Sequence, residues 1–394
     1  MSDLDSFRSE TRDWLEANCP AGVRGSTQLM GVWGGRRGTF PSDDARLWLE
    51  RMVEKGWTVP TWSKEYGGAG LSDAEAEVLT QEMQRLEANA PLFSFGMAML
   101  APALMEFASE EQMLEFLPPI ARGEIRWCQG YSEPGAGSDL ASLRTRAVRD
   151  GDHYVVNGSK IWTSDADVSD WIFALVRTDP DVPKHYGISF LLIDMETPGV
   201  SVSPIELISG ASPFCETFFD DVRVPVANRV GEENKGWDIA KRLLQHERAM
   251  LAVGGSGRAP QRKSLVEVAR EAMSTPEGVL PEAALREELV QFEMDRLCYG
   301  ATFQRSTDAA KAGRGPGPET SMFKLYLSEM NQRGSDLRQR MVGADGLGWA
   351  GEGFKKDELQ ITREWLYGRA GTILGGTSEI QMNIIAKRVL GLPD

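Results

Sequence analysis

The fold of this chain is decided by one stretch, Gln129-Gly130-Tyr131-Ser132-Glu133-Pro134-Gly135-Ala136-Gly137-Ser138-Asp139, which follows a mostly apolar run from Ile125 to Cys128. This order predicts a strand, then a tight turn whose backbone amides are exposed. Glycines let the main chain approach a ligand closely, and consecutive N–H groups with serine hydroxyls can hold a phosphate or the edge of a planar ring. Taken alone, the stretch is better explained as an ordinary Gly-Pro hairpin loop.

A second segment changes that balance. Lys160-Ile161-Trp162-Thr163-Ser164 follows a predicted hairpin that runs from Ala147 to Gly158. The two segments together resemble the acyl-CoA dehydrogenase family, in which a T/S-E-P-x-A-G-S-D segment, or a close variant, is followed at this spacing by K-x-W-x-T/S. In that family the two segments hold the isoalloxazine ring of FAD between them. Two motifs at the right spacing are much more specific than either one alone.

The resemblance assigns residues of both segments to the cofactor site. It implies that Tyr131 and Ser132 lie at the pyrimidine edge and the N5 side of the flavin. It places Ser138 near the pyrophosphate, and Trp162 with Ser164 against the other edge. The residues that it assigns to FAD in this region are Gln129, Tyr131, Ser132, Gly137, Ser138, Trp162 and Ser164.

Composition limits the classes of function that this chain can have. The chain has 394 residues, enough for two or three domains, and its 43 Lys and Arg against 58 Asp and Glu give a net charge of −15. Such a surface repels nucleic acid and anionic lipid. The four cysteines and three histidines are scattered without ligand spacing, which predicts a reducing, cytoplasmic location and no metal site.

Two segments bear on whether this is a membrane protein, and neither has the sequence that a membrane protein needs. The first residues, Met1 to Glu10, are acidic and polar, unlike a secretory signal. A charge-free run from Ala88 to Met105 is long enough to raise the question of a membrane span, but it contains two prolines and a glycine. We therefore interpret this run as a buried helix with a broken start.

Periodicity divides the chain into three domains. Apolar residues recur at helical spacing over residues 1–125, at strand spacing over 126–234, and at helical spacing again over 235–394, where the clearest break runs from Ala312 to Pro318. The predicted fold is α+β: an N-terminal helical domain, a middle antiparallel β-barrel or sandwich, and a C-terminal four-helix bundle. The resemblance implies the same domain order over nearly the whole chain.

The position of the catalytic base is unusual. Oxidation of an acyl thioester between Cα and Cβ needs a carboxylate to take the α-proton. Many family members carry this glutamate just before a G-T-x-x-I-Q segment, where this chain has Gly375. A glycine cannot accept a proton, so either the chain is inactive or another residue supplies the base. In the same segment, Thr377 and Glu379 match positions that contact FAD in relatives, although Thr377 is also explained as a simple helix cap.

Glu247 is the candidate base. Apolar or small residues lie three, four and seven positions before and after it, so helical geometry places it in the middle of an apolar stripe. Desolvation there would raise its pKa toward the working range. A buried glutamate paired with an arginine is the alternative, but Arg248 points to another side of the helix. The long-chain and isovaleryl types of the family carry their base in an E-R dipeptide on this helix, which Glu247-Arg248 resembles.

One family motif is absent and another is altered, and both concern cofactor contacts between subunits. The R-x-x-F-G segment that a neighbouring subunit lends to FAD is absent from Gln261 to Asp295, and the Q-x-x-G-G-x-G segment reads Arg340 to Gly346 with Arg in place of Gln. This pattern is similar to the heteromeric dehydrogenases of actinobacterial steroid side-chain breakdown. The resemblance implies an α2β2 assembly with a second dehydrogenase-like subunit, in which this chain supplies the base.

The resulting hypothesis is an FAD-dependent dehydrogenation of an acyl-CoA thioester to the trans-2-enoyl-CoA, with an electron-transfer flavoprotein as acceptor. Gly375 and Gly376 remove side-chain bulk where typical members carry the base, which leaves room for a branched or ring-bearing acyl group, although a simple turn also explains them. The resemblance to the steroid enzymes implies a steroid (cholesterol-type) acyl group. Three alternatives remain: a non-catalytic assembly subunit, a homotetrameric branched-chain or fatty acyl-CoA dehydrogenase, and an oxidase relative.

Overall fold

The computed structural model describes residues 3–25, 32–252, 263–273, 275, 280–309 and 320–393, and the side chains of residues 247–252 lie outside this description. The predicted break from Ala312 to Pro318 also lies outside it. The chain divides into two compact units. One includes Met1–Ile205 and Pro213–Glu247, and the other includes Glu206–Ser212 and Gln261–Asp394.

The first unit begins with helices, as the sequence predicts. Ser72 starts one of them with a capping box, in which its hydroxyl and the Glu75 side chain each bind the other's backbone N–H. Ser109 and Gln112 form the same device at the next long helix. The helices of this region are α1 (Asp3–Asn18), α2 (Asp43–Glu54), α3 (Asp73–Arg85), α4 (Ala101–Phe107) and α5 (Glu110–Arg122).

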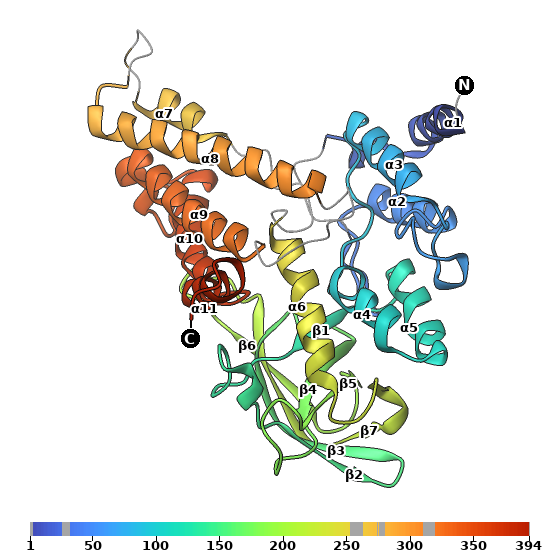
Figure 1. The fold of residues 1–394 in the computed structure, drawn as a ribbon. Helices are drawn as coiled ribbons and strands as arrows, with labels where there is room; N and C mark the ends of the chain where they lie inside the picture. The colour runs from blue at the N-terminus through green and yellow to red at the C-terminus, as the bar shows by residue number, and fades with distance from the viewer. Residues whose placement is uncertain are drawn as a thin grey trace. The chain divides into compact units, whose positions relative to one another are not determined.

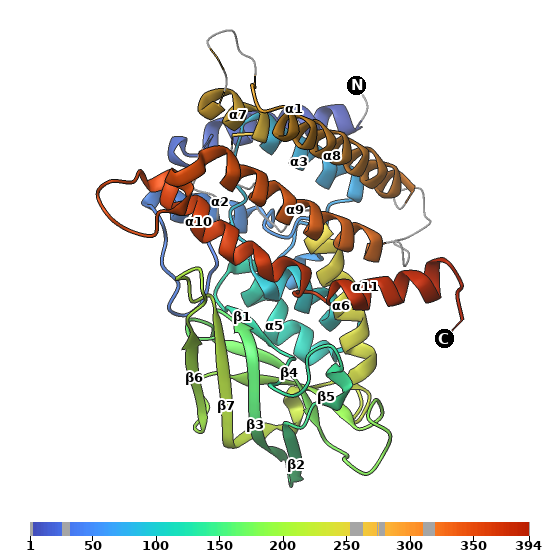
Figure 2. The ribbon, with the colours of Figure 1, turned by 90° about the vertical axis from the view of Figure 1, so that its left-hand side faces the viewer.

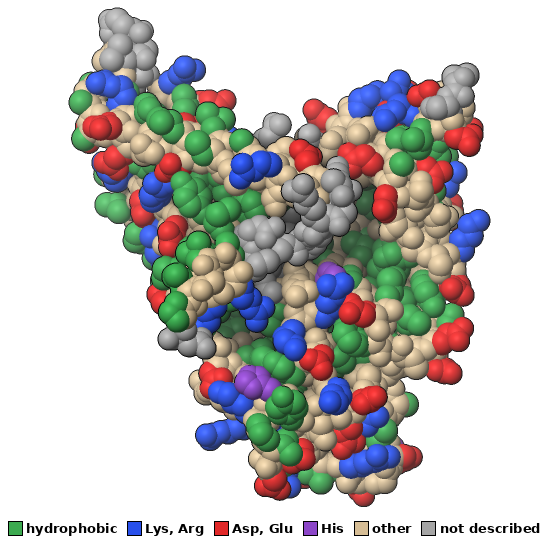
Figure 3. Space-filling view, viewed as in Figure 1, with side chains coloured by type: hydrophobic (Ala, Val, Ile, Leu, Met, Phe, Trp, Pro, Cys, Tyr) green, Lys and Arg blue, Asp and Glu red, His purple; other side chains and the backbone are tan. Residues whose placement is uncertain are grey.

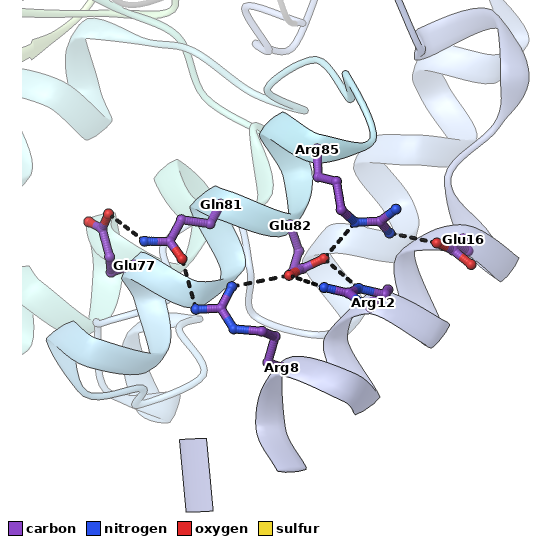
Figure 4. Close-up of polar contacts among 7 residues, drawn as sticks. All are labelled: Arg8, Arg12, Glu16, Glu77, Gln81, Glu82 and Arg85. Atoms are coloured by element: carbon purple, nitrogen blue, oxygen red, sulfur yellow. Dashed lines mark hydrogen bonds and ion pairs between the residues drawn. The ribbon is translucent and has the colours of Figure 1, made fainter. Parts of the chain in front are cut away.

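Helices α1 and α3 are joined by a buried carboxylate. The Glu82 side chain is only 3% exposed and accepts hydrogen bonds from Arg12 at 2.9 and 3.0 Å, from Arg8 at 3.1 Å and from Arg85 at 2.8 Å, as Figure 4 shows. Hydrogen bonding from Arg12 is the largest of the effects that lower the pKa of Glu82 to about 2. The Glu82 carboxylate therefore stays charged far below neutral pH.

The strands of the first unit form one sheet. The predicted strands around Trp171, Ile188, Val200 and Glu216 are all present, and the order is β6-β7-β3-β2-β4-β5-β8 with β1 paired to β4. Figure 2 shows β6, β7, β3 and β2 side by side. The strands are β1 (Trp127–Gly130), β2 (Arg146–Asp150), β3 (His153–Ser164), β4 (Trp171–Arg177), β5 (Ile188–Asp194), β6 (Val200–Ile205), β7 (Phe214–Pro225) and β8 (Arg229–Val230).

The sheet is mixed rather than purely antiparallel. The pairs β1·β4 and β2·β4 are parallel, and the other pairs in the described chain are antiparallel. The long ladder between β3 and β7 shifts register twice, and the second shift falls between Ile161 and Thr163. A bulge of this kind re-aims the side chain of the extra residue. Here that residue is Trp162.

Helix α6 (Gly236–Ala252) starts against β5. A side chain at Gly236 would come within 2.5 Å of the Ser189 backbone, so glycine allows this close approach. Ala240 and Leu243 of α6 are fully buried, as the predicted apolar stripe requires. In Figure 3, Lys and Arg side chains lie interspersed with Asp and Glu on the face in view.

The second unit is helical, as predicted for the C-terminal region. Its core joins Leu265 and Val268 to Leu285, Leu289 and Leu337. Within the described part of the chain, none of the helices combines the length and apolar character that crossing a bilayer needs. Figure 1 shows the helices of this unit, which are α7 (Leu265–Met273), α8 (Ala283–Ala309), α9 (Thr320–Val342), α10 (Lys356–Gly368) and α11 (Ser378–Ile384).

Candidate active site

The Gly-rich stretch forms the loop that its sequence predicts. Strand β1 ends at Gly130, and Tyr131 is buried directly after it. The loop then folds back on itself, because Glu133 and Ala136 exchange both backbone N–H···O=C hydrogen bonds, at 3.1 and 3.0 Å. Gly137 and Ser138 follow as exposed residues. The backbone beyond the turn is thus open to a ligand.

This loop is fixed to the start of the second motif. The Ile161 N–H donates to the Ser132 carbonyl oxygen at 2.9 Å. Beneath it, the fully buried Lys160 ammonium donates to the Tyr131 carbonyl oxygen at 3.2 Å and to Glu133 Oε1 at 2.7 Å. The two sequence motifs are therefore side by side in space, and an ion pair between them sets their separation.

The Lys160–Glu133 pair is buried and hydrogen-bonded on both sides. Besides Lys160, the Glu133 carboxylate accepts from the backbone N–H groups of Arg144 at 2.6 Å and Thr145 at 2.9 Å. Burial acts to raise the pKa of Glu133, but Lys160 and these donors lower it below its usual range. Burial lowers the pKa of Lys160 to about 8, against the opposing effect of Glu133. Sequence reasoning missed this pair, although both residues are letters of the two motifs.

Trp162 has a strained backbone and a solvent-facing ring. Its φ is +63°, in the left-handed region that a bulky side chain rarely adopts, at the β3 bulge. Trp162 is 51% exposed, and its ring meets Phe214 edge-on, with centroids 6.1 Å apart. Strain of this kind persists where the fold imposes it and gathers at functional sites. The ring offers a flat apolar wall beside the Ser132 loop.

The other residues of this site lie close to these two segments along the chain. Gln129 belongs to β1, and Ser164 is the last residue of β3, opposite Phe214. A side chain added at Gly137 would meet no atom within 4 Å, so the loop there borders open space. An exposed aromatic wall beside an open glycine and serine backbone fits a flat heteroaromatic ring with a phosphate tail. These residues are therefore suited to hold FAD.

Thr377 and Glu379 belong to the second unit. The Thr377 hydroxyl caps α11 by accepting from the Ile380 N–H at 3.3 Å, so the simple structural explanation of this residue is realised. Glu379 is exposed in the first turn of the same helix. Hydrogen bonding to its own backbone N–H is the largest cause that lowers its pKa.

The glycine turn before α11 is held from two sides. Gly375 and Gly376 have φ values of +62° and +90°. The buried Gln381 amide donates to the Gly375 carbonyl oxygen at 2.9 Å, and the buried Lys324 ammonium donates to the Gly376 carbonyl oxygen at 2.6 Å. The turn thus has a left-handed backbone conformation that favours glycine at both positions.

The predicted base, Glu247, lies on α6, and its side chain is outside the described residues. Arg340, which replaces the family's glutamine, lies on α9 and pairs with Glu288 of α8 at 2.6 Å. This pair occupies the Arg340 guanidinium within the second unit.

Comparison with known proteins identifies the family of this chain. Sequence models of the acyl-CoA dehydrogenase N-terminal, middle and C-terminal domains match residues 2–124, 128–222 and 234–390. The chain is 38% identical to acyl-CoA dehydrogenase IpdE1 of Mycobacterium tuberculosis, over 100% of this chain and 99% of that protein. The chain therefore belongs to the acyl-CoA dehydrogenase family, whose members are oxidoreductases that act on acyl-CoA.

Two solved structures show the same fold. The Tcur3481-Tcur3483 steroid ACAD superposes with a TM-score of 0.73 at 32% identity, over 100% of this chain and 98% of that chain. The ChsE4-ChsE5 complex from Mycobacterium tuberculosis gives a TM-score of 0.70 at 29% identity, also over 100% and 98%. Each of these two proteins has a name made of two components.

Proposed function

We propose that this chain is the base-bearing subunit of an FAD-dependent acyl-CoA dehydrogenase that converts a steroid side-chain CoA thioester to its trans-2-enoyl-CoA. The observation that carries the proposal is the wall formed by Trp162 beside the Ser132 loop. Its strained φ of +63° and half-exposed ring are costly features that a ring-shaped ligand would explain. FAD held by these residues would supply the acceptor for the β-hydrogen, which leaves the substrate as a hydride.

The chain's own residues have separate tasks in this proposal. Trp162 and the loop from Tyr131 to Ser132 orient the flavin ring, and the exposed Ser138 binds its phosphate tail. Lys160 and Glu133 hold the loop at its distance from β3. Glu247 takes the α-proton of the thioester, because its place on an apolar stripe of α6 raises the basicity of a carboxylate.

A second subunit completes the assembly. The absent R-x-x-F-G segment and the Arg340–Glu288 pair support the inference that this chain lends little to a neighbour's flavin. The related steroid ACAD and the ChsE4-ChsE5 complex are each named as two components, which supports an α2β2 arrangement. An electron-transfer flavoprotein is the acceptor that we propose.

The substrate assignment rests on the relatives and on the glycine turn. A steroid ACAD is 32% identical to this chain over its full length. The Gly375-Gly376 turn leaves no side chain where a typical member carries its base, and this favours a bulky acyl group.

The test is the visible absorption spectrum of the chain purified alone and after co-expression with a second dehydrogenase-like chain. Each sample is mixed anaerobically with a steroid side-chain CoA thioester. We expect yellow protein only with the partner, and bleaching when the thioester is added. Flavin-saturated, fully active protein from the single chain would refute the heteromeric assignment.

The base is tested by Glu247→Gln in the same assay, with Asp238→Asn as the control because Asp238 is an exposed carboxylate on the same helix. We expect Glu247→Gln to keep its flavin and lose bleaching by at least a hundredfold in rate. Full bleaching by Glu247→Gln would exclude Glu247 as the base. Flavin-free protein in every preparation would instead favour a non-catalytic assembly subunit.

A further inference from the structure

The start of α6 is held to the sheet by a closed ring of three hydrogen bonds. The Thr178 hydroxyl, directly after β4, donates to Asn234 Oδ1 at 2.5 Å and lies 2.7 Å from the hydroxyl of Ser189 on β5. The Asn234 backbone N–H donates to Ser189 Oγ at 2.8 Å, and Ser189 is fully buried. One set of proton positions satisfies all three contacts, because Ser189 can then donate to Thr178. We call these three residues the Asn234 ring.

The Asn234 side chain is part of this attachment, and not only its backbone. Asn234 stands two residues before α6 and has a φ of +67°, in the left-handed region. Asparagine adopts that conformation more readily than most residues, but glycine adopts it most readily. A turn alone would be served at least as well by glycine, whereas the asparagine carboxamide also offers the Thr178 hydroxyl an acceptor.

The ring acts on a helix that lies very close to the sheet. A Cβ at Gly236, the first residue of α6, would come within 2.5 Å of the Ser189 carbonyl carbon. Further along the helix, Ile239, Ala240 and Leu243 are buried against the core. Hydrophobic burial is non-directional, so it holds α6 against the core but does less to fix its angle. Hydrogen bonds depend on direction, and the ring places three of them where the helix begins.

The angle at which α6 leaves this ring matters because the helix carries the proposed base. Glu247 stands eleven residues after Gly236. At a rise of about 1.5 Å per residue, it lies about 16 Å further along the helix axis. Over that length, a rotation of about 4° at the start of α6 would move the base by about 1 Å. A displacement of about 1 Å can lower the rate of a proton transfer by about a hundredfold.

We propose that Asn234 is a positioning residue for the dehydrogenation. Through Thr178 and Ser189 it fixes the angle of α6, and so it aligns Glu247 with the α-carbon of the thioester. This inference rests on the proposed function, which makes Glu247 the base. The alternative is that Asn234 only shapes the turn before α6, and its loss would then alter stability without altering the rate of the bound complex.

The test is Asn234→Gly in the flavin-loaded protein, with its partner subunit where that is required for loading. Glycine keeps the left-handed φ without strain and removes the carboxamide. Anaerobic bleaching is followed by stopped flow over a range of concentrations of a steroid side-chain CoA thioester, which gives the limiting rate and the apparent Kd. We expect the limiting rate to fall about tenfold or more while the apparent Kd changes less than about twofold and the flavin stays bound.

Three further variants show whether the effect passes through the ring. Asn234→Asp keeps an acceptor for the Thr178 hydroxyl, so it should recover most of the rate. Thr178→Val removes the donor and should slow bleaching as Asn234→Gly does, and the two changes together should be less than additive. Asn157→Ala is the matched control, because Asn157 binds both the backbone N–H and the side chain of Asp221, at 2.9 Å each, between β3 and β7. Its limiting rate should stay native.

Several results would overturn the inference. A native limiting rate in Asn234→Gly, or an equal fall in Asn157→Ala, would show that Asn234 has no positioning role. A native rate in Thr178→Val would show that the carboxamide does not act through the ring. If Asn234→Gly does not retain flavin, the limiting rate of Thr178→Val decides in its place.

Failure of this inference is distinguishable from failure of the proposed function. If Glu247→Gln loses bleaching while Asn234→Gly bleaches at the native rate, only the positioning role is wrong. If Glu247→Gln bleaches at the native rate, the assignment of the base is wrong, whatever the Asn234 variants do.

Discussion

Replacement of Lys160 by methionine tests whether the buried ion pair sets the geometry of the flavin loop. Methionine fills much of the same volume, so the change removes the ammonium without opening a large cavity. Removal of one partner of a buried pair typically costs 3–5 kcal/mol, because the other charge stays buried and uncompensated. Glu133 keeps two backbone donors, Arg144 N–H at 2.6 Å and Thr145 N–H at 2.9 Å. We therefore expect the lower end of that range, about 3 kcal/mol.

The assay has two readouts. Urea unfolding followed by circular dichroism gives the loss of stability, and titration of the apoprotein with FAD gives the loss of affinity. The Tyr131 carbonyl also loses its 3.2 Å hydrogen bond from Lys160, so the loop should become less ordered and FAD should bind at least about tenfold more weakly. A purely structural pair far from the cofactor would alter stability alone.

The matched control is a double-variant cycle with Glu133→Gln. Because the two charges compensate each other, Lys160→Met combined with Glu133→Gln should be less destabilised than the sum of the single changes, by about 1.5 kcal/mol or more. Additive single effects would show that the two residues are not coupled. Normal FAD affinity in Lys160→Met would refute the positioning role even if stability fell.

Three further changes have definite expected outcomes. Glu82→Gln should lower the free energy of unfolding near neutral pH by about 2 kcal/mol, measured by urea unfolding. Because the pKa of Glu82 is lowered in the folded state, its stabilising contribution is complete above about pH 4.3 and is lost as the pH falls toward 2. A gap between wild type and variant that persists at pH 2 would contradict this. Trp162→Gly should relieve about 1 kcal/mol of backbone strain but lose the edge contact with Phe214, so the stability of the fold should change little. FAD affinity, measured by titration, should nevertheless fall more than about tenfold. Lys324→Met should leave the Gly376 carbonyl without its buried donor, which should lower stability by about 1–2 kcal/mol in thermal unfolding and speed proteolysis at the turn. Unchanged proteolysis would show that the turn does not depend on Lys324.

The architecture was largely predictable because its signals are local. Helix starts such as Ser72 carry their own capping chemistry, and the strands around Trp171 and Ile188 are continuous β-branched and aromatic runs. The parallel pairing of β1 and β2 with β4 was not predictable in this way. Strand order depends on which segments meet across the sheet, and single-segment periodicity holds no information about that.

The site shows the same division. The glycines and Trp162 could be identified from the motifs, but the strained φ of Trp162 could not, since it arises from a register shift against β7. The buried partner of Lys160 was likewise hidden, although Glu133 stands in the quoted stretch. The closeness of Arg146 to Arg177 was also not predictable, because only the pairing of β2 with β4 brings these two residues together.

The turn at Gly375 and Gly376 bears on where the catalytic base lies. A side chain at Gly375 would adopt φ near +62°, at a cost of about 1–2 kcal/mol, and a Cβ at Gly376 would approach Gln381 Nε2 to 2.7 Å. Relaxation of the turn would break the hydrogen bonds from Gln381 and Lys324. A position that had merely lost its glutamate would tolerate other residues, whereas this turn is built around glycine. We infer that this position leaves room for the substrate and that the catalytic base lies on another element. Glu247 of α6 is the candidate for that base.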